Sequence, residues 1–226
     1  MTGTLYLVSI PIGNNLDITY RAIEVLQNCN FILIESTEGN KFLNKNKITT
    51  QTEIFNEHNQ LKNSSLIIED LKKGKNISLI SDCGTPLFSD PGFKLVQLAI
   101  QNKIKVVPIP GASSLMAALI VSGFDISKFL FYGWLSQKKE IRQKELISIK
   151  TNPYTLVIME TPYRLKSLME DVVKYFGTMR KVCLAYNLTM QDELIMHSNT
   201  GELLEKINRE KIKGEFVLIF EGFKRT

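Results

Sequence analysis

The sequence predicts an α/β protein that consists of two α/β domains. Short apolar runs alternate with helical patterns over the first half of the chain, which is typical of a mainly parallel sheet. Beyond that half, strand-like runs become more frequent. The chain has 226 residues, which is long enough for two domains of ordinary size. We therefore expect an N-terminal domain over residues 1–113 with a mainly parallel sheet, and a C-terminal domain over residues 114–226 with a mixed sheet.

In the N-terminal half, apolar runs of strand length are followed by loops and helical patterns. The strands are expected at Leu5–Ile10, Phe31–Ile34, Ile77–Ile80 and Val106–Ile109. The helices are expected after a cap at Asp17 or Thr19, around Leu66–Leu71 with a stop at Gly74, and over Phe93–Ile100. The stretch between the second strand and the second helix is polar and has no predicted element.

The C-terminal half begins with a helix over Leu115–Val121. Five strands are expected at Phe129–Gly133, Thr155–Met159, Lys181–Ala185, Glu193–His197 and Phe216–Phe220, with two helices between the first three. The last two strands are close enough in the sequence to pair antiparallel.

Charge, cysteine and histidine content narrow the class of protein. The net charge of +5 is compatible with a polyanionic partner, although an exposed helix face explains the basic run Lys138–Lys144 equally well. Apolar runs are too short to cross a bilayer, and the amino terminus lacks the pattern of a secretory signal. Cys29, Cys83 and Cys183 form no Cys-x-x-Cys pair, so a reducing cytoplasm fits best. His58 and His197 stand alone, and we expect no metal.

Three loops that follow predicted strands carry the polar residues suited to a ligand site. The longest is Ser81–Gly92, in which Asp82, Thr85, Ser89 and Asp90 offer carboxylates and hydroxyls. The other two are Pro11–Asn14 and Pro110–Ser113. Ligands of parallel sheets bind at the carboxyl ends of the strands, so the loops together predict a pocket for a small molecule. The alternative is that their Gly and Pro residues only form turns.

Familiar catalytic signatures are missing from the sequence. It contains no Gly-x-Gly-x-x-Gly, no phosphate-binding loop with Gly-Lys-Ser/Thr and no Gly-x-Ser-x-Gly. Cys83 lies in the long loop, where we favour a packing or backbone role over a nucleophilic one. Glu57-His58-Asn59 is a dense acid/base cluster, and it is also an ordinary polar loop before a helix.

At these loops the sequence resembles the small-subunit ribosomal RNA methyltransferase I family, a branch of the tetrapyrrole methylases. The matching motifs extend in order over nearly the whole chain. They are Gly3–Val8, Pro11–Asn14 with Asp17–Thr19, Ser81–Gly92, Pro110–Ser114, Glu160–Arg164 and Lys213–Val217.

The resemblance implies S-adenosyl-L-methionine as cofactor, bound in a cleft between two α/β domains of a homodimer. It implies methyl transfer to the ribose 2′-hydroxyl of a cytidine in small-subunit ribosomal RNA. The implied cofactor-binding residues are Pro11, Gly13, Asp82, Gly84, Thr85, Pro86, Ser89, Gly111, Ala112, Ser113, Met159, Ala185, Leu188 and Gly214. Glu57, Asp82 and Glu35 are the candidate bases for the ribose hydroxyl.

The chain departs from the family pattern at several polar positions. Glu38, Asn56, Tyr186, Asn187 and Met190 replace other residues, and a cation is lost at Glu38, Tyr186 and Met190. Fewer phosphate contacts would weaken RNA binding. Two alternatives therefore stay open: a methyltransferase for a tetrapyrrole or another small molecule, and a relative that binds the cofactor without turnover.

Overall fold

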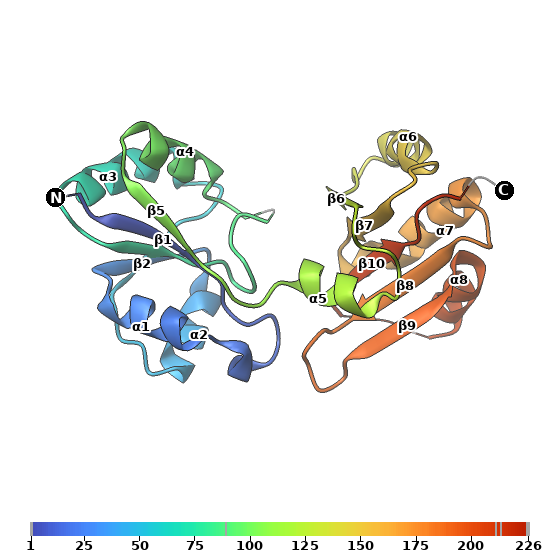
Figure 1. Cartoon of the computed structure of the whole chain (residues 1–226), viewed down its shortest axis with the longest axis horizontal. Coiled ribbons are helices and arrows are strands. Elements are labelled where there is room, and N and C mark those ends of the chain that lie inside the picture. Colours follow the sequence, from blue (N-terminus) through green and yellow to red (C-terminus); the bar gives the residue numbers. More distant parts are fainter. Residues whose placement is uncertain (1, 89, 211, 213, 225–226) are drawn as a thin grey trace. The chain divides into compact units, whose positions relative to one another are not determined.

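A computed structural model of the chain describes residues 2–88, 90–210, 212 and 214–224. The chain forms two compact units, Met1–Ser113 and Ser114–Thr226, each built around its own five-stranded sheet (Figure 1). Among the described residues, no helix is both long and apolar enough to span a membrane.

The sheet of the N-terminal unit is parallel throughout. Its strands are β1 (Thr4–Val8), β2 (Phe31–Ile34), β3 (Thr52–Ile54), β4 (Ile77–Leu79) and β5 (Lys105–Ile109). They lie in the order β3-β2-β4-β1-β5, and every pairing is parallel. The predicted parallel sheet is thus confirmed, and its geometry puts the carboxyl ends of all five strands at one edge.

Helices cover both faces of this sheet. They are α1 (Tyr20–Asn28), α2 (Thr37–Lys45), α3 (Gln60–Lys72) and α4 (Phe93–Gln101), preceded by the 3-10 turn η1 (Asn15–Asp17). α1 and α2 pack on one face, and α3 and α4 pack on the other (Figure 1). Of the two predicted caps, Thr19 caps α1 by accepting the Ala22 amide at 3.1 Å.

Two elements of the N-terminal unit, β3 and α2, were not predicted from the sequence. β3 has three residues, and Glu53 and Ile54 in it are exposed. α2 is polar and buries only Gly39 and Leu43. β3 is too short to show an alternating pattern, and α2 contains few apolar residues. With β3 included, the strand predicted as the fourth is the fifth, β5.

The sheet of the C-terminal unit is mixed. Its strands are β6 (Phe129–Trp134), β7 (Thr155–Met159), β8 (Lys181–Tyr186), β9 (Leu194–Asn199) and β10 (Phe216–Phe220). Their order is β6-β7-β10-β8-β9, and only the β6–β7 pair is parallel. The predicted pairing of the last two strands is wrong: β9 pairs with β8, and β10 lies between β7 and β8. A strand inserted between two earlier ones buries both of its edges, which suits the fully apolar Phe216–Phe220.

Most helices of this unit pack against one face of its sheet. They are α6 (Lys139–Ile149), α7 (Leu165–Phe176) and α8 (Thr200–Arg209), with the 3-10 turn η2 (Pro162–Arg164) before α7. α5 (Ser114–Val121) contacts β10. α8 was not predicted. The solvated-face interpretation of the basic run is wrong for Arg142, whose side chain is buried against Asp171.

Candidate functional site

Three loops meet at the carboxyl edge of the parallel sheet, as the sequence predicted. The amide of Ile10 donates to the carbonyl of Gly84 at 2.9 Å, which joins the loops after β1 and β4. The Thr85 hydroxyl donates to the carbonyl of Ala112 at 3.0 Å, which joins the loops after β4 and β5. The Ser9 and Thr85 hydroxyls are also 3.0 Å apart. Because Thr85 has one hydroxyl proton and gives it to Ala112, Ser9 is the donor to Thr85.

Glycines allow this close approach. Gly84 has φ +72°, and a Cβ there would lie 3.1 Å from Ile12 Cγ2. A Cβ at Gly111 would lie 3.0 Å from Ser9 Cβ and 3.1 Å from the Ser9 carbonyl oxygen. Both contacts are tighter than ordinary side-chain packing, so larger residues would push the loops apart.

The loops border a hollow of about 270 Å³. It is lined by Leu7, Ser9, Thr85, Pro86, Pro108, Ile109, Pro110 and Gly111. Apolar walls with a few hydroxyl and backbone polar groups are typical of sites for small organic ligands. The hollow and the glycine contacts fit a nucleoside-type cofactor that lies against backbone.

Four carboxylates gather beside these loops. Glu35 follows β2, Glu57 follows β3, and Asp82 and Asp90 belong to the loop after β4. Asp82 accepts the Ser36 hydroxyl at 2.7 Å and the Ser36 amide at 3.2 Å. Partial burial, together with the charge of Asp82, raises the pKa of Glu35.

Asp90 was absent from the predicted catalytic set. Burial, followed by the charge of Glu35, raises its pKa to about 7, although a hydrogen bond with Ser81 opposes the shift. The sequence showed Asp90 as one polar residue of the loop, but the nearby charge with the largest effect on it, Glu35, comes from the segment after β2. Perturbed carboxylates of this kind are common at functional sites.

The predicted cofactor residues of the N-terminal unit lie on the three joined loops. Pro11, Gly84 and Pro86 are buried, Gly13, Asp82 and Gly111 are exposed, and Thr85, Ala112 and Ser113 are half-buried. Ser89 lies outside the described residues. Among the candidate bases, Glu57 and Asp82 are exposed and Glu35 is half-buried.

The predicted cofactor residues of the C-terminal unit lie at the edge where β7 and β8 end. Met159 ends β7 and is half-buried, Leu188 is buried beyond β8, and Ala185 is fully buried within β8. A Cβ at Gly214 would overlap Asn187 Oδ1 and lie 2.6 Å from the Tyr186 hydroxyl oxygen. A side chain at position 214 would therefore have to displace the ends of the Asn187 and Tyr186 side chains.

Glu38 and Asn56 are among the positions that depart from the family pattern and have local partners. Glu38 forms an ion pair with Lys41 in the first turn of α2, at 2.5 Å. Asn56 accepts the His58 amide at 3.1 Å and stabilises the turn that holds Glu57. In the described part of the chain, no three His, Cys, Asp or Glu side chains form a group able to hold a metal ion.

Comparison with known proteins places the chain in a class. A family model described as Tetrapyrrole (Corrin/Porphyrin) Methylases matches residues 4–204. The fold is similar to that of cobalt precorrin-4 methyltransferase, with TM-score 0.70, 14% identity and coverage of 96% of this chain and 94% of the other. Uroporphyrin-III-C-methyltransferase from Thermus thermophilus gives TM-score 0.68, 17% identity and coverage of 97% and 94%. The chain has the fold of the tetrapyrrole methylases.

Relatives in sequence identify the family, within the tetrapyrrole methylases, to which the chain belongs. Ribosomal RNA small subunit methyltransferase I of Halalkalibacterium halodurans is 40% identical over 221 residues, 97% of this chain and 76% of the relative. The protein of the same name from Escherichia coli O157:H7 is 39% identical over 225 residues, covering 98% and 79%. The chain belongs to the ribosomal RNA small subunit methyltransferase I family. This confirms the resemblance and the α/β fold class inferred from the loop motifs.

Proposed function

We propose that the protein transfers the methyl group of S-adenosyl-L-methionine to the ribose 2′-hydroxyl of a cytidine in small-subunit ribosomal RNA. The observation that carries the proposal is the set of three joined loops at the carboxyl edge of the parallel sheet. The loops form the kind of hollow a nucleoside-type cofactor needs, and relatives about 40% identical are named ribosomal RNA small subunit methyltransferase I.

The cofactor would rest on backbone of the joined loops. Pro11, Gly13, Gly84, Thr85, Pro86, Gly111 and Ala112 would supply close backbone surface, and Asp82, Ser89 and Ser113 would supply side chains. In the C-terminal unit, Met159, Leu188 and Gly214 would supply apolar and close-packed surface. Ala185 is fully buried and would support this surface without touching the cofactor. Bound S-adenosyl-L-methionine supplies an electrophilic methyl group, so no metal is needed.

The chain's own task is to hold the acceptor oxygen in line and to take its proton. A ribose hydroxyl is a poor nucleophile at neutral pH, and a nearby carboxylate that accepts its proton helps the oxygen to attack. Glu57 is exposed and is our first candidate, with Asp82 and Glu35 as alternatives. Asp82 is a weaker candidate because the Ser36 amide and hydroxyl already occupy its two carboxylate oxygens.

RNA is favoured over a tetrapyrrole or another small molecule as the acceptor. The solved tetrapyrrole enzymes share only 14% and 17% identity with this chain, whereas the ribosomal RNA enzymes share about 40%. A silent relative is disfavoured because relatives about 40% identical over nearly the whole chain are named as methyltransferases.

A homodimer in the cytoplasm is part of the same proposal. Leu115, Ala118 and Leu119 of α5 pack inward, whereas Met116 and Ile120 are 49% and 69% exposed. An apolar strip of this kind on a helix favours contact with a second copy. The buried thiols of Cys29 and Cys183, which form no disulfide, suit a reducing compartment.

Methylation of unmodified ribosomal subunits tests the reaction. Purified protein would be incubated with methyl-labelled S-adenosyl-L-methionine and small subunits from cells that lack this modification, and the digested RNA analysed by mass spectrometry. We expect labelled 2′-O-methylcytidine. Cofactor binding without label in RNA would overturn the acceptor, and label in an added tetrapyrrole would support the small-molecule alternative.

A further inference from the structure

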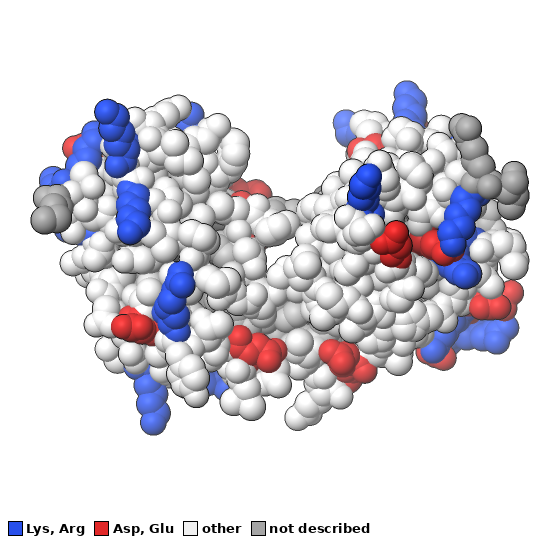
Figure 2. Space-filling view, viewed as in Figure 1, with Lys and Arg blue, Asp and Glu red and all other residues white. Residues whose placement is uncertain are grey.

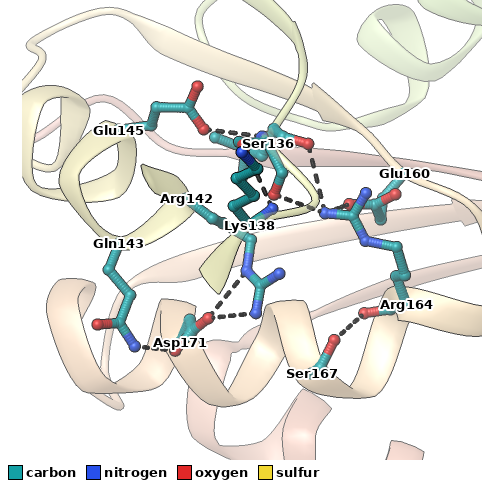
Figure 3. Close-up of polar contacts among 10 residues, drawn as sticks. Ser136, Lys138, Arg142, Gln143, Glu145, Glu160, Arg164, Ser167 and Asp171 are labelled. Atoms are coloured by element: carbon teal, nitrogen blue, oxygen red, sulfur yellow. Dashed lines mark hydrogen bonds and ion pairs between the residues drawn. The ribbon is translucent and has the colours of Figure 1, made fainter. Parts of the chain in front are cut away.

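Two loops of the C-terminal unit are fastened together where the parallel strands β6 and β7 end. Arg164, at the end of η2, donates through Nη2 to the carbonyls of Leu135 at 3.3 Å and Ser136 at 2.9 Å (Figure 3). The same nitrogen pairs with Glu160 Oε2 at 2.9 Å. The carboxylate of Glu160 is fully buried, so loss of Arg164 would leave a buried charge without its partner. Arg164 therefore fixes the loop after β6 against the loop after β7.

The loop after β6 is also held from its other side. The Ser136 amide donates to Glu145 Oε2 at 2.8 Å, and the Lys138 amide donates to Ser136 Oγ at 3.2 Å (Figure 3). A turn that is only exposed to solvent does not need this set of hydrogen bonds. The contacts hold the backbone that carries Lys138 and Lys139 in one conformation.

The fastened loops present aromatic and basic side chains to solvent. Trp134 is 42% exposed at the end of β6, and Tyr163 is 95% exposed in η2. Lys138, Lys139 and Lys166 are exposed, and none of them forms an ion pair within the described part of the chain. Elsewhere lysines such as Lys41 and Lys72 have acidic partners.

Tyr163 and Lys166 also border a hollow of about 600 Å³ next to α8. It is lined by Pro162, Tyr163, Leu165, Lys166, Ile207, Asn208, Arg209, Glu210, Ile212 and Gly214. Its size suits a nucleobase with its sugar, and its mixed apolar and polar lining suits a planar heterocycle.

Aromatic rings beside unpaired cations are the chemistry of single-stranded RNA binding. Exposed rings stack on unpaired bases, and lysines neutralise phosphates. On the face drawn in Figure 2, basic and acidic side chains are scattered, so net charge alone does not mark an RNA surface there. Protein–protein interfaces are depleted in lysine, whereas three exposed lysines accompany the two rings on these loops.

We propose that the loops at the ends of β6 and β7 bind unpaired nucleotides of the substrate RNA. Tyr163 and Trp134 stack on bases, Lys138, Lys139 and Lys166 contact phosphates, and Arg164 is the positioning residue that holds the two loops in register. This inference rests on the proposed RNA methyltransferase function and adds the surface that recognises the acceptor strand.

Binding of unmethylated small subunits, and of their protein-free ribosomal RNA, tests the surface. The variants are Tyr163→Ala and the double variant Lys138→Gln/Lys139→Gln. The matched controls are Tyr154→Ala and Lys128→Gln, which precede β7 and β6 at the opposite edge of the sheet and contact each other at 5.8 Å. Dissociation constants would be measured from 50 to about 300 mM salt, with S-adenosyl-L-methionine affinity and melting temperature as checks on folding.

We expect Tyr163→Ala to weaken RNA binding about five- to hundredfold. The double lysine variant should reduce the slope of log Kd against log salt by about 1 to 2. Both should leave cofactor affinity within about twofold, and the two controls should match the wild type. Arg164→Lys keeps the charge but loses the two-carbonyl geometry, so we expect a raised KM for RNA with kcat retained.

The outcomes separate this inference from the proposed function. Wild-type methylation with unchanged RNA affinity in both loop variants would refute the surface and leave the function standing. Weaker binding to whole subunits but not to protein-free RNA would mean that the loops contact a ribosomal protein, which also refutes it. A wild type that neither binds nor methylates RNA would overturn the proposed function and this inference together.

Discussion

A single hydroxyl joins the loops of the candidate cofactor site. Thr85 donates to the Ala112 carbonyl and accepts from Ser9, so one side chain links the segments that follow β1, β4 and β5. The backbone hydrogen bond from Ile10 to Gly84 and the close packing at Gly84 and Gly111 also join these loops. Thr85 is therefore the side chain whose change reports most directly on the hollow.

Thr85→Val should loosen this junction. The substitution keeps the shape of the side chain but leaves a carbonyl and a hydroxyl without their partner, which costs about 1–3 kcal/mol for buried groups. We expect the free energy of unfolding to fall by about 1–2 kcal/mol and affinity for S-adenosyl-L-methionine to fall at least tenfold by calorimetry. Thr85→Ser keeps the hydroxyl and should retain most of both. Equal losses in the two variants would show that the methyl group matters and the hydrogen bonds do not.

A change at Glu57 should lower the rate of catalysis without changing cofactor binding. Removal of a general base lowers turnover by about 10²–10⁴. We expect Glu57→Gln to lower kcat at least about a hundredfold with unchanged cofactor affinity, as measured by label transfer and calorimetry. Glu53→Gln changes an exposed carboxylate on β3 nearby and is the control. Full turnover in Glu57→Gln would remove Glu57 from the mechanism.

Asp90 should make stability depend on pH. Its pKa rises from the ordinary 3.8 to about 7 in the folded protein, so the folded state binds a proton more tightly than the unfolded state does. The favourable contribution is complete below about pH 4 and is lost as the pH rises toward about 7. In urea titrations, the stability of the wild type minus that of Asp90→Asn should fall over this range and be flat above about pH 8. A difference that does not change with pH would contradict the shifted pKa.

At the scale of elements, α6 and α7 are joined by a buried ion pair. Arg142 contacts Asp171 through Nη2 at 2.7 Å and Nε at 2.9 Å, and Gln143 donates to the other carboxylate oxygen at 3.0 Å. The two charged side chains are 7% and 6% exposed. The pair therefore sets how the helix after the β6 loop lies on its neighbour (Figure 3).

Breaking this pair should cost more than replacing it. Arg142→Met leaves the Asp171 charge buried without a partner, which typically costs about 3–5 kcal/mol. Arg142→Met/Asp171→Leu removes both charges and should recover most of the loss, because an apolar pair of similar size packs in the same space. Urea denaturation measures both. A double variant as unstable as the single one would show that the pair itself stabilises the fold.

Elements with strong apolar periodicity were predictable from the sequence, and those defined by tertiary pairing were not. Phe31–Ile34 and Phe216–Phe220 form strands at the expected residues because they are apolar throughout. β3 is a strand only because β2 offers it an edge, and local residues carry little sign of that. The same limit explains the wrong partner for β9, since sequence proximity does not reveal that β10 inserts beside β8.

The candidate site was partly predictable for the same reason. The joined loops follow from the parallel direction of the strands, which their alternation with helices indicates, and from the Gly and Pro residues that follow them. Asp90 and Arg164 were not predicted because their roles depend on neighbours from distant segments. Asp90 depends on Glu35, and Arg164 depends on the carbonyls of Leu135 and Ser136.

At the scale of the whole molecule, the proposed homodimer makes a prediction about mass. Light scattering should give twice the 25.7 kDa of one chain. Ile120→Glu places a charge on the exposed apolar strip of α5 and should shift the protein toward monomer. Ile100→Glu, on an exposed position of α4, is the control and should not. A wild type that is monomeric at micromolar concentration would refute the dimer.

The strand order of the N-terminal sheet also bears on how the protein is made. β1 is synthesised first, yet its partners are β4 and β5: Leu5 pairs with Ile77 and Val106. Because long-range parallel pairing forms slowly, the emerging chain holds an apolar strand with at least one open edge until about residue 109 has left the exit tunnel. Translation therefore exposes β1 to aggregation over most of the synthesis of its unit. The nascent chain would be the first place to look for chaperone dependence in this protein.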